Sequence, residues 1–342
     1  MKIMDWWRGR ANTAQSPLDK QRITDAVERI VQTTNPRLRY AQGYQKKLAP
    51  AVKASIDYAH ELVASLPAAR EASTAAWAAD PFIRALFVNP DALVQSLSRA
   101  LDLRTHFEQN PGQTEAFAVV GMEMSERKVL GMAMEGDLLQ RDVTQTNVNF
   151  SDHRARICGS TEAELREELE RRIVDQLALE GLARIVADDS RRTELKQESA
   201  LLKARSAMLE GEGAGIRAAL GGEAAGQAKL AQLRAQMTEN SRELAGLGVG
   251  AELLDRQLEH IRGVLAEPAR HLYLSSRRLR LDGMNVVIDD PGAQTGVELE
   301  FLVARLPGTV PPQDRAFVLV RFPRAELLPA QQLRDDAARW LM

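Results

Sequence analysis

Apolar residues in the stretch 230–265 recur at alternating intervals of three and four residues, without a slip across five heptads. This period is typical of a helix that packs lengthwise against another helix in a coiled coil. Charged residues such as Arg234 and Glu243 fall beside the seam. We therefore predict a long helix whose partner-binding seam comprises Leu230, Leu233, Met237, Asn240, Leu244, Leu247, Leu254, Leu258 and Ile261.

A second helix is predicted upstream, over about 161–210, where Thr161 and Glu164 form a capping-box pattern and proline is absent. Glycines concentrated in 211–226 end that helix. Two arms of nearly equal length favour an antiparallel hairpin. The alternative is that the second arm pairs with its copy in a dimer, with Asn240 helping to fix the register.

The hairpin pattern has two weak places. Gly246, Gly248 and Gly250 interrupt the second arm, and Asp188–Ser190 interrupts the first. If these points face each other, they form an elbow; a local bend is the simpler interpretation, because glycine lowers helix stability.

Outside the hairpin, helical periodicity prevails up to Asn110, and short strand-like runs follow on both sides of the hairpin. We expect a meander of about four strands in 111–160. The predicted fold is α+β and mainly α, with an antiparallel β unit split by a long antiparallel coiled-coil hairpin. Its parts are a flexible tail (1–16), a helical bundle (17–110), the β unit with a C-terminal helix (111–160 plus 267–342) and the hairpin (161–266).

Composition narrows the choice of partner and compartment. The net charge is −2 over 342 residues, which argues against nucleic acid as the main partner. The single cysteine excludes an internal disulfide and fits a reducing compartment. No apolar run reaches the length of a membrane span, and the N-terminus lacks the apolar core of a secretion signal. We expect a cytoplasmic protein without a transmembrane segment.

A search for catalytic chemistry finds no motif. The five histidines show no zinc-binding spacing, and there is neither a nucleophile elbow nor a phosphate-binding loop. Cys158 precedes a helix start, which in principle lowers a thiol pKa, but its nearest base in sequence is His153. Five residues apart on a strand, the two should point to opposite faces. We predict no catalytic, cofactor-binding or metal site, and no enzyme.

Two further groups are candidate contact sites. Arg277, Arg278 and Arg280 form a candidate anion-binding cluster, and Arg154 and Arg156 belong to the same predicted β unit. The alternative is that these charges guard an exposed edge strand. Trp6 and Trp7 are a possible docking element for a protein or a membrane surface, unless both rings pack back onto the body.

These observations favour a non-enzymatic scaffold or adaptor that acts by protein–protein interaction. The coiled-coil hairpin would bind a partner protein or a second copy of the chain. The alternative is a module that binds an anionic ligand or nucleic acid through the arginine cluster on the β unit.

Overall fold

The computed structural model describes residues 17–135, 138–213, 223–288, 296–306 and 313–329. The fold is α+β with more helix than strand, as predicted. The chain divides into a helical unit (Met1–Ser55 with Asp175–Pro268) and a sheet unit (Ile56–Val174 with Ala269–Met342). Two long helices, α2 and α7, contribute residues to each unit.

The helical unit is built from helices that meet through side chain to backbone contacts and close packing. Ser55 Oγ donates to the carbonyl of Leu265 at 2.7 Å, from a fully buried position. A Cβ placed on Gly181 would lie 2.8 Å from the Cα of Ile261, so these two backbones approach closely. The elements are α1 (Pro17–Thr34), η2 (Pro36–Tyr40), α2 (Tyr44–Ala64), α7 (Glu162–Gly213), α9 (Glu223–Gly246), α10 (Ala251–Ala266) and η3 (Pro268–Arg270).

The sheet unit contains one sheet with strand order β3-β2-β6-β5-β4, and a two-residue strand, β1, pairs parallel to β6. All other pairs are antiparallel. The strands are β1 (Arg70–Glu71), β2 (Glu115–Glu135), β3 (Leu138–Gly159), β4 (Tyr273–Leu281), β5 (Val297–Leu306) and β6 (Gln313–Pro323). The short helices are α3 (Thr74–Ala79), α4 (Pro81–Leu86), α5 (Pro90–Ser98), α6 (Leu101–Gln109) and η4 (Arg324–Glu326).

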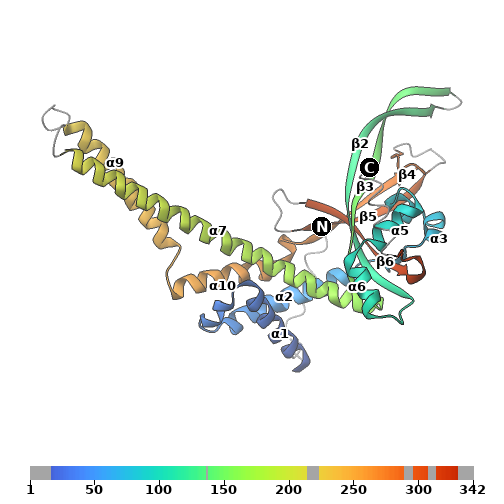
Figure 1. The fold of residues 1–342 in the computed structure, drawn as a ribbon, viewed down its shortest axis with the longest axis horizontal. Coiled ribbons are helices and arrows are strands. Elements are labelled where there is room, and N and C mark those ends of the chain that lie inside the picture. Colours follow the sequence, from blue (N-terminus) through green and yellow to red (C-terminus); the bar gives the residue numbers. More distant parts are fainter. Residues whose placement is uncertain (1–16, 136–137, 214–222, 289–295, 307–312, 330–342) are drawn as a thin grey trace, which may run out of the picture. The chain divides into compact units, whose positions relative to one another are not determined.

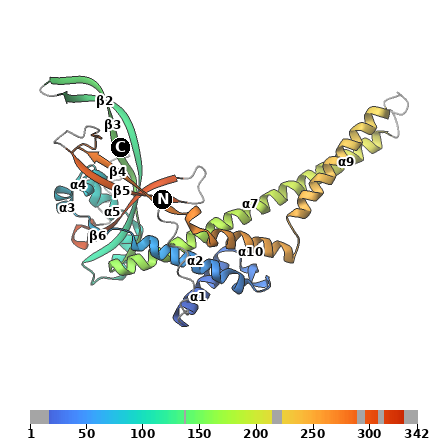
Figure 2. The ribbon, with the colours of Figure 1, turned by 180° about the vertical axis from the view of Figure 1, so that it is seen from behind.

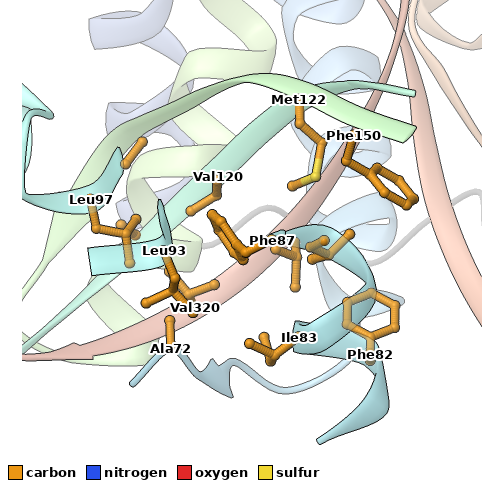
Figure 3. Packing of buried hydrophobic residues seen from close by; sticks show 14 of the residues in the cluster. Ala72, Phe82, Ile83, Phe87, Leu93, Leu97, Val120, Met122, Phe150 and Val320 are labelled. Atoms are coloured by element: carbon orange, nitrogen blue, oxygen red, sulfur yellow. The ribbon is translucent and has the colours of Figure 1, made fainter. Parts of the chain in front are cut away.

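One face of this sheet forms the main hydrophobic core with α4, α5 and α6. Alternate residues of β2 and β6, such as Val120 and Val320, are fully buried against Phe87 and Leu93 from the short helices (Figure 3). Phe82 and Phe301 stack with ring centroids 5.2 Å apart. The helices of 74–109 therefore share their core with the sheet, whereas we expected them to form one bundle with the helices of 17–64.

The predicted four-strand meander in 111–160 is wrong. The segment forms two long strands, β2 with 21 residues and β3 with 22, which run beside each other (Figure 1). Ser125–Arg127 pairs with β3 in regular register, and the turn-like group Ser151–Asp152 lies at a bulge. Asp152 has a φ of 51° at this bulge. A bulge accommodates one extra residue without ending the strand, so this group does not form the predicted turn.

The opposite face of the sheet lies toward the end of α2 and the start of α7, and side chains from all three line one cavity. Arg166 ties these helices together, because its guanidinium donates to the carbonyls of Val63 at 2.7 Å and Pro67 at 2.8 Å. The first bond of the predicted capping box is confirmed, because Glu164 N donates to Thr161 Oγ1. The carboxylate of Glu164 also reaches back, but it accepts from Ser160 N at 2.8 Å, one residue before the N-cap Thr161. The tail 1–16 and the predicted helix of 330–342 lie outside the described residues.

Candidate functional site

The seam helix and α7 lie side by side in both views of the molecule (Figures 1 and 2). Leu233, Asn240 and Leu247 are buried, while Leu230, Met237 and Leu244 are half-buried. The matching positions of α7 also alternate by three and four; we call them the inner seam. They are Asp188, Arg192, Leu195, Ser199, Leu202, Ser206 and Leu209, and all are buried or half-buried.

Specific contacts show the direction of the pair. Arg234 bridges to Glu210 at 3.2 Å, and Arg191 bridges to Glu243 at 2.7 Å. Between them, Asn240 Nδ2 donates to the carbonyl of Leu195 at 3.1 Å. Residue numbers fall on α7 as they rise on α9, so the helices are antiparallel. Within the chain, α7 thus covers the seam that we predicted as partner-binding.

The buried amide of Asn240 makes a second bond, to Glu198 Oε2 at 3.1 Å. A polar side chain 5 % exposed in an apolar seam is stabilised only where such acceptors lie opposite it. Sliding the helices would remove both acceptors. Asn240 therefore favours one register within the chain, a role we had assigned to it only in the dimer alternative.

The prediction of a single long seam helix is wrong in one respect, because the helix breaks between α9 and α10. Gly248 and Gly250 have φ values of 72° and 59°, which glycine adopts without strain. Leu254, Leu258 and Ile261 thus lie on α10, where Leu258 and Ile261 are buried and Leu254 is half-buried. The first arm does not break, because α7 is continuous through Asp188–Ser190.

The break lies beside the predicted weak place of the first arm. Arg192 Nη2 donates to the carbonyls of Leu247 at 2.7 Å and Gly248 at 3.2 Å. One turn earlier, Asp188 Oδ2 accepts from Arg256 Nε at 2.7 Å and lies 2.8 Å from His260 Nε2. Burial raises the pKa of Asp188, but these two bonds outweigh burial and hold the pKa below its ordinary value. Two residues of α7 thus fix the break in place.

A second face of α7 carries a feature that our sequence analysis missed. Leu179, Val186, Leu201 and Met208 are 43 %, 55 %, 51 % and 70 % exposed. At 3.6 residues per turn they share one line on the helix, opposite the inner seam. Uncharged exposed residues fill the remaining positions of this line. We call it the outer stripe: Leu179, Ala183, Val186, Ser190, Thr193, Gln197, Leu201, Ala204 and Met208.

The predicted arginine cluster lies on β4, and its members face acidic residues. Arg278 pairs with Glu300 directly opposite it on β5, at 3.4 Å. Arg277 pairs with Glu126 of β2 at 3.0 Å. Arg280 lies opposite Glu298 in the register. These contacts distribute charge along an exposed strand and do not converge on one point. The predicted docking residues Trp6 and Trp7 lie outside the described residues.

Cys158 and His153 do not form a catalytic pair. Burial raises the pKa of the Cys158 thiol to about 12, so the thiolate is disfavoured. His153 stacks on Phe87, and its Nε2 lies 2.8 Å from the carbonyl of Leu86. Both residues face the main core, because Ile157 adds a residue between them at a bulge. The expectation that they point to opposite faces is wrong for this reason.

The sheet unit contains a cavity of about 450 Å³ on the sheet face opposite the main core. Leu62 and Val63 of α2, Leu66 just after it, and Leu169 and Ile173 of α7 line one side. Val119, Phe317 and Leu274 line the sheet side, together with Gly121. Such a volume lies within the range of about 300–1,000 Å³ that is usual for small-molecule sites.

The charged residues that line this cavity are Arg154, Arg156 and Arg315. Arg315, only 18 % exposed, donates to Asp152 Oδ2 at 2.9 Å. Arg154 Nε donates to the same carboxylate at 2.9 Å, and Arg156 bonds Asp102 at 2.9 Å. These bonds from Arg154 and Arg315 hold the pKa of Asp152 below its ordinary value. Arg154 and Arg156, which the sequence analysis named only as neighbours of the β4 arginines, thus line an apolar space together with Arg315, which it did not single out.

No family model, curated protein or solved structure matches the chain. Within the described ranges, no group of three or more histidine, cysteine, aspartate or glutamate residues is arranged to hold a metal ion. The described helices include none with the length and apolar character needed to cross a bilayer.

Proposed function

We propose that the protein is a non-enzymatic scaffold that acts through its α7/α9 helix pair, and that the partner is a second copy of the chain. The outer stripe of α7 carries this proposal. From Leu179 to Met208 it extends about 43 Å at the helical rise of about 1.5 Å per residue. A continuous uncharged line on an exposed helix favours coverage by another helix.

The inner seam does not offer this surface, because α9 already covers it within the chain. Leu195 and Leu202 of the inner seam are 1 % and 4 % exposed, whereas Leu201, one position from Leu202, is 51 % exposed. A partner of the pair must therefore bind another face. On α7, the outer stripe is the face where large apolar side chains meet water.

The spacing of the stripe favours a second copy over an unrelated helix. Its four large residues are separated by seven, fifteen and seven positions, a series that reads the same in both directions. An antiparallel second copy would place Leu179 opposite Met208 and Val186 opposite Leu201. A twofold axis requires such self-complementarity. If residue i of one copy contacts residue j of the second copy, then residue j of the first copy contacts residue i of the second.

Charges beside the stripe favour the same direction. Glu180 and Arg205 lie on one flank, and Asp189 and Lys196 lie on the other. In the antiparallel arrangement, Glu180 comes level with Arg205 of the second copy to within one turn, and Asp189 with its Lys196. Exposed pairs of this kind contribute little affinity but disfavour the wrong orientation.

Sedimentation equilibrium of the full chain tests the proposal. We expect a dimer that becomes monomeric when Val186→Arg and Leu201→Arg place charges in the outer stripe. Ala231→Arg with Ala235→Arg adds equal charge at exposed positions of α9, and this control should remain dimeric. A monomeric native chain, or a stripe variant that still dimerises, would overturn the proposal. Circular dichroism establishes that each variant keeps its helices.

A charge exchange tests the orientation. Arg205→Glu alone should weaken the dimer several-fold, because two like charges come level. Adding Glu180→Arg should restore the affinity, since the flank pair is then reversed. If the double variant is no tighter than the single one, the antiparallel arrangement is wrong.

Anion binding by Arg277, Arg278 and Arg280 is the alternative function. It has less support, because Arg277 and Arg278 each pair with a glutamate and the side chains follow a strand. A ligand would first have to displace those carboxylates.

A further inference from the structure

We propose that the sheet unit binds a small amphipathic anion, an aliphatic chain with one anionic head group, in the cavity between the sheet and the helices α2 and α7. The aliphatic chain would occupy the apolar part and the head group would meet Arg154 and Arg156. All lining residues belong to the sheet unit. This site is independent of the outer stripe of α7.

The lining separates into an apolar part and a cationic part. Leucine, valine, isoleucine and phenylalanine side chains, most of them from α2, α7 and four strands, form most of the wall. The charged lining residues are arginines, and no aspartate or glutamate is among the described residues that line the cavity. A neutral apolar ligand would leave these guanidinium groups unused, and a polar anion without a chain would leave the apolar wall in water.

A second hollow of about 270 Å³ lies at the edge strand β3 beside residues 96–101, and Arg154 and Arg156 line this hollow as well as the larger cavity. It adds Arg99, and acidic residues are likewise absent from its described lining. The two shared arginines thus lie where an apolar space meets a cationic one. An anionic head group there would meet the guanidinium groups of Arg154 and Arg156, and guanidinium groups bind carboxylate and phosphate oxygens in pairs.

These two arginines retain donors for a ligand. Among the described residues, Arg154 is bonded through Nε to Asp152 and Arg156 through Nη1 to Asp102. Both side chains are 63 % exposed. Within the described part of the chain, three arginines line the larger cavity, and two carboxylates, Asp152 and Asp102, pair with them. Three positive charges less two negative charges leave one positive charge, which a singly charged head group would balance.

The backbone of β3 directs both arginines to this side of the sheet. Bulges at Asp152 and Ile157 bracket them, with φ values of 51° and 57°. A β-branched residue with positive φ is a rare and strained conformation. Ile157 itself lines the cavity. Strain of this kind is concentrated at binding sites, and bulges commonly re-aim side chains beside them.

Calorimetric titration of the full chain with dodecanoate, below its micelle concentration, tests the proposal. We expect saturable binding with one site per chain. Dodecyl phosphate distinguishes a phosphate head group from a carboxylate, and tighter binding of either anion supports the site and names its head group. Dodecanol carries the same aliphatic chain without charge and should bind at least about tenfold more weakly, because it forms no charge-assisted hydrogen bond. Absence of binding by both anions, or equal binding of the alcohol, would overturn the proposal.

Two variants locate the ligand. Arg154→Gln with Arg156→Gln should weaken dodecanoate binding at least about tenfold. The matched control, Arg278→Gln with Arg280→Gln, removes two strand arginines from β4 and should leave the affinity unchanged. If the control weakens binding as much as the first variant, the site is wrong.

Gly121→Phe fills the cavity from the sheet. A Cβ at Gly121 meets no atom within 4 Å, and Gly121 lines the cavity, so the larger side chain has space. Binding of dodecanoate should be lost while the melting temperature is kept or raised, because a β-strand favours phenylalanine over glycine. Unchanged binding by the folded Gly121→Phe protein would contradict the assigned cavity.

Discussion

The two sides of α7 differ in what covers them, although their sequences look alike. The inner seam and the outer stripe both follow the helical repeat over the same stretch. Leu195 on the inner seam is 1 % exposed and lies against α9, whereas Leu201 on the outer stripe is 51 % exposed. Periodicity therefore identifies a surface that another helix can cover, but it does not say which chain provides that helix.

The largest effect should come from the inner seam. Leu195→Ala removes a buried side chain between α7 and α9 and leaves a cavity, so we expect a loss of about 2–4 kcal/mol in the free energy of unfolding. Urea unfolding followed by circular dichroism measures it. A loss well below 1 kcal/mol would mean that the two helices do not support each other in solution.

A smaller effect is expected at the break between α9 and α10. Asp188→Asn keeps the shape of the side chain but removes the charge that Arg256 and His260 meet, which should cost about 1–2 kcal/mol. The pKa of Asp188 is lowered in the folded state, so this stabilisation is present above the ordinary aspartate value of about 3.9. It is lost as the pH falls through the lower, folded-state pKa.

The measurement compares the native chain with Asp188→Asn by urea unfolding at neutral and at acidic pH. Their difference should be largest near neutral pH and should shrink once the carboxyl group is protonated. Asp189→Asn is the control, because Asp189 is exposed and meets Arg192 only at 3.9 Å. A difference that grows on acidification would reverse the assigned sign.

The smallest effect belongs to the outer stripe. Leu201→Ala changes an exposed residue of the single chain, so its unfolding free energy should stay within about 0.5 kcal/mol of the native value. The comparison is made at protein concentrations too low for copies to associate. A larger loss there would show that Leu201 is covered within the chain, and the contrast between the two faces would disappear.

The sequence predicted the helix pair well because its signal is local. Each seam residue from Leu230 to Leu247 repeats the same interval, and Thr161 with Glu164 marks the helix start. The outer stripe was also present in the sequence, but it lies opposite the inner seam of the same helix. Two apolar lines on opposite sides of a helix cancel each other's amphipathic signal, so the sequence of α7 does not show a single apolar face.

The sheet unit was harder to predict because its pairings are long-range. Ser125–Arg127 has turn-forming composition yet lies inside β2, where pairing with β3 overrides local preference. The cavity had no local signal at all, since its wall joins α2, α7 and five strands that are far apart in sequence. Arg154 and Arg156 were noted only as possible neighbours of the β4 arginines, because alternation alone does not reveal a bulge.

The paired bulges of β3 make the length of this segment as important as its composition. Ser151 to Gly159 spans two added residues, and each one reverses the side to which the following side chains point. Deleting either residue would turn Arg154 and Arg156, or Cys158 and its neighbours, through the sheet. A one-residue deletion here would therefore place a charged side chain in the hydrophobic core beside Phe87. Most single substitutions at the same positions would leave the core without a charge.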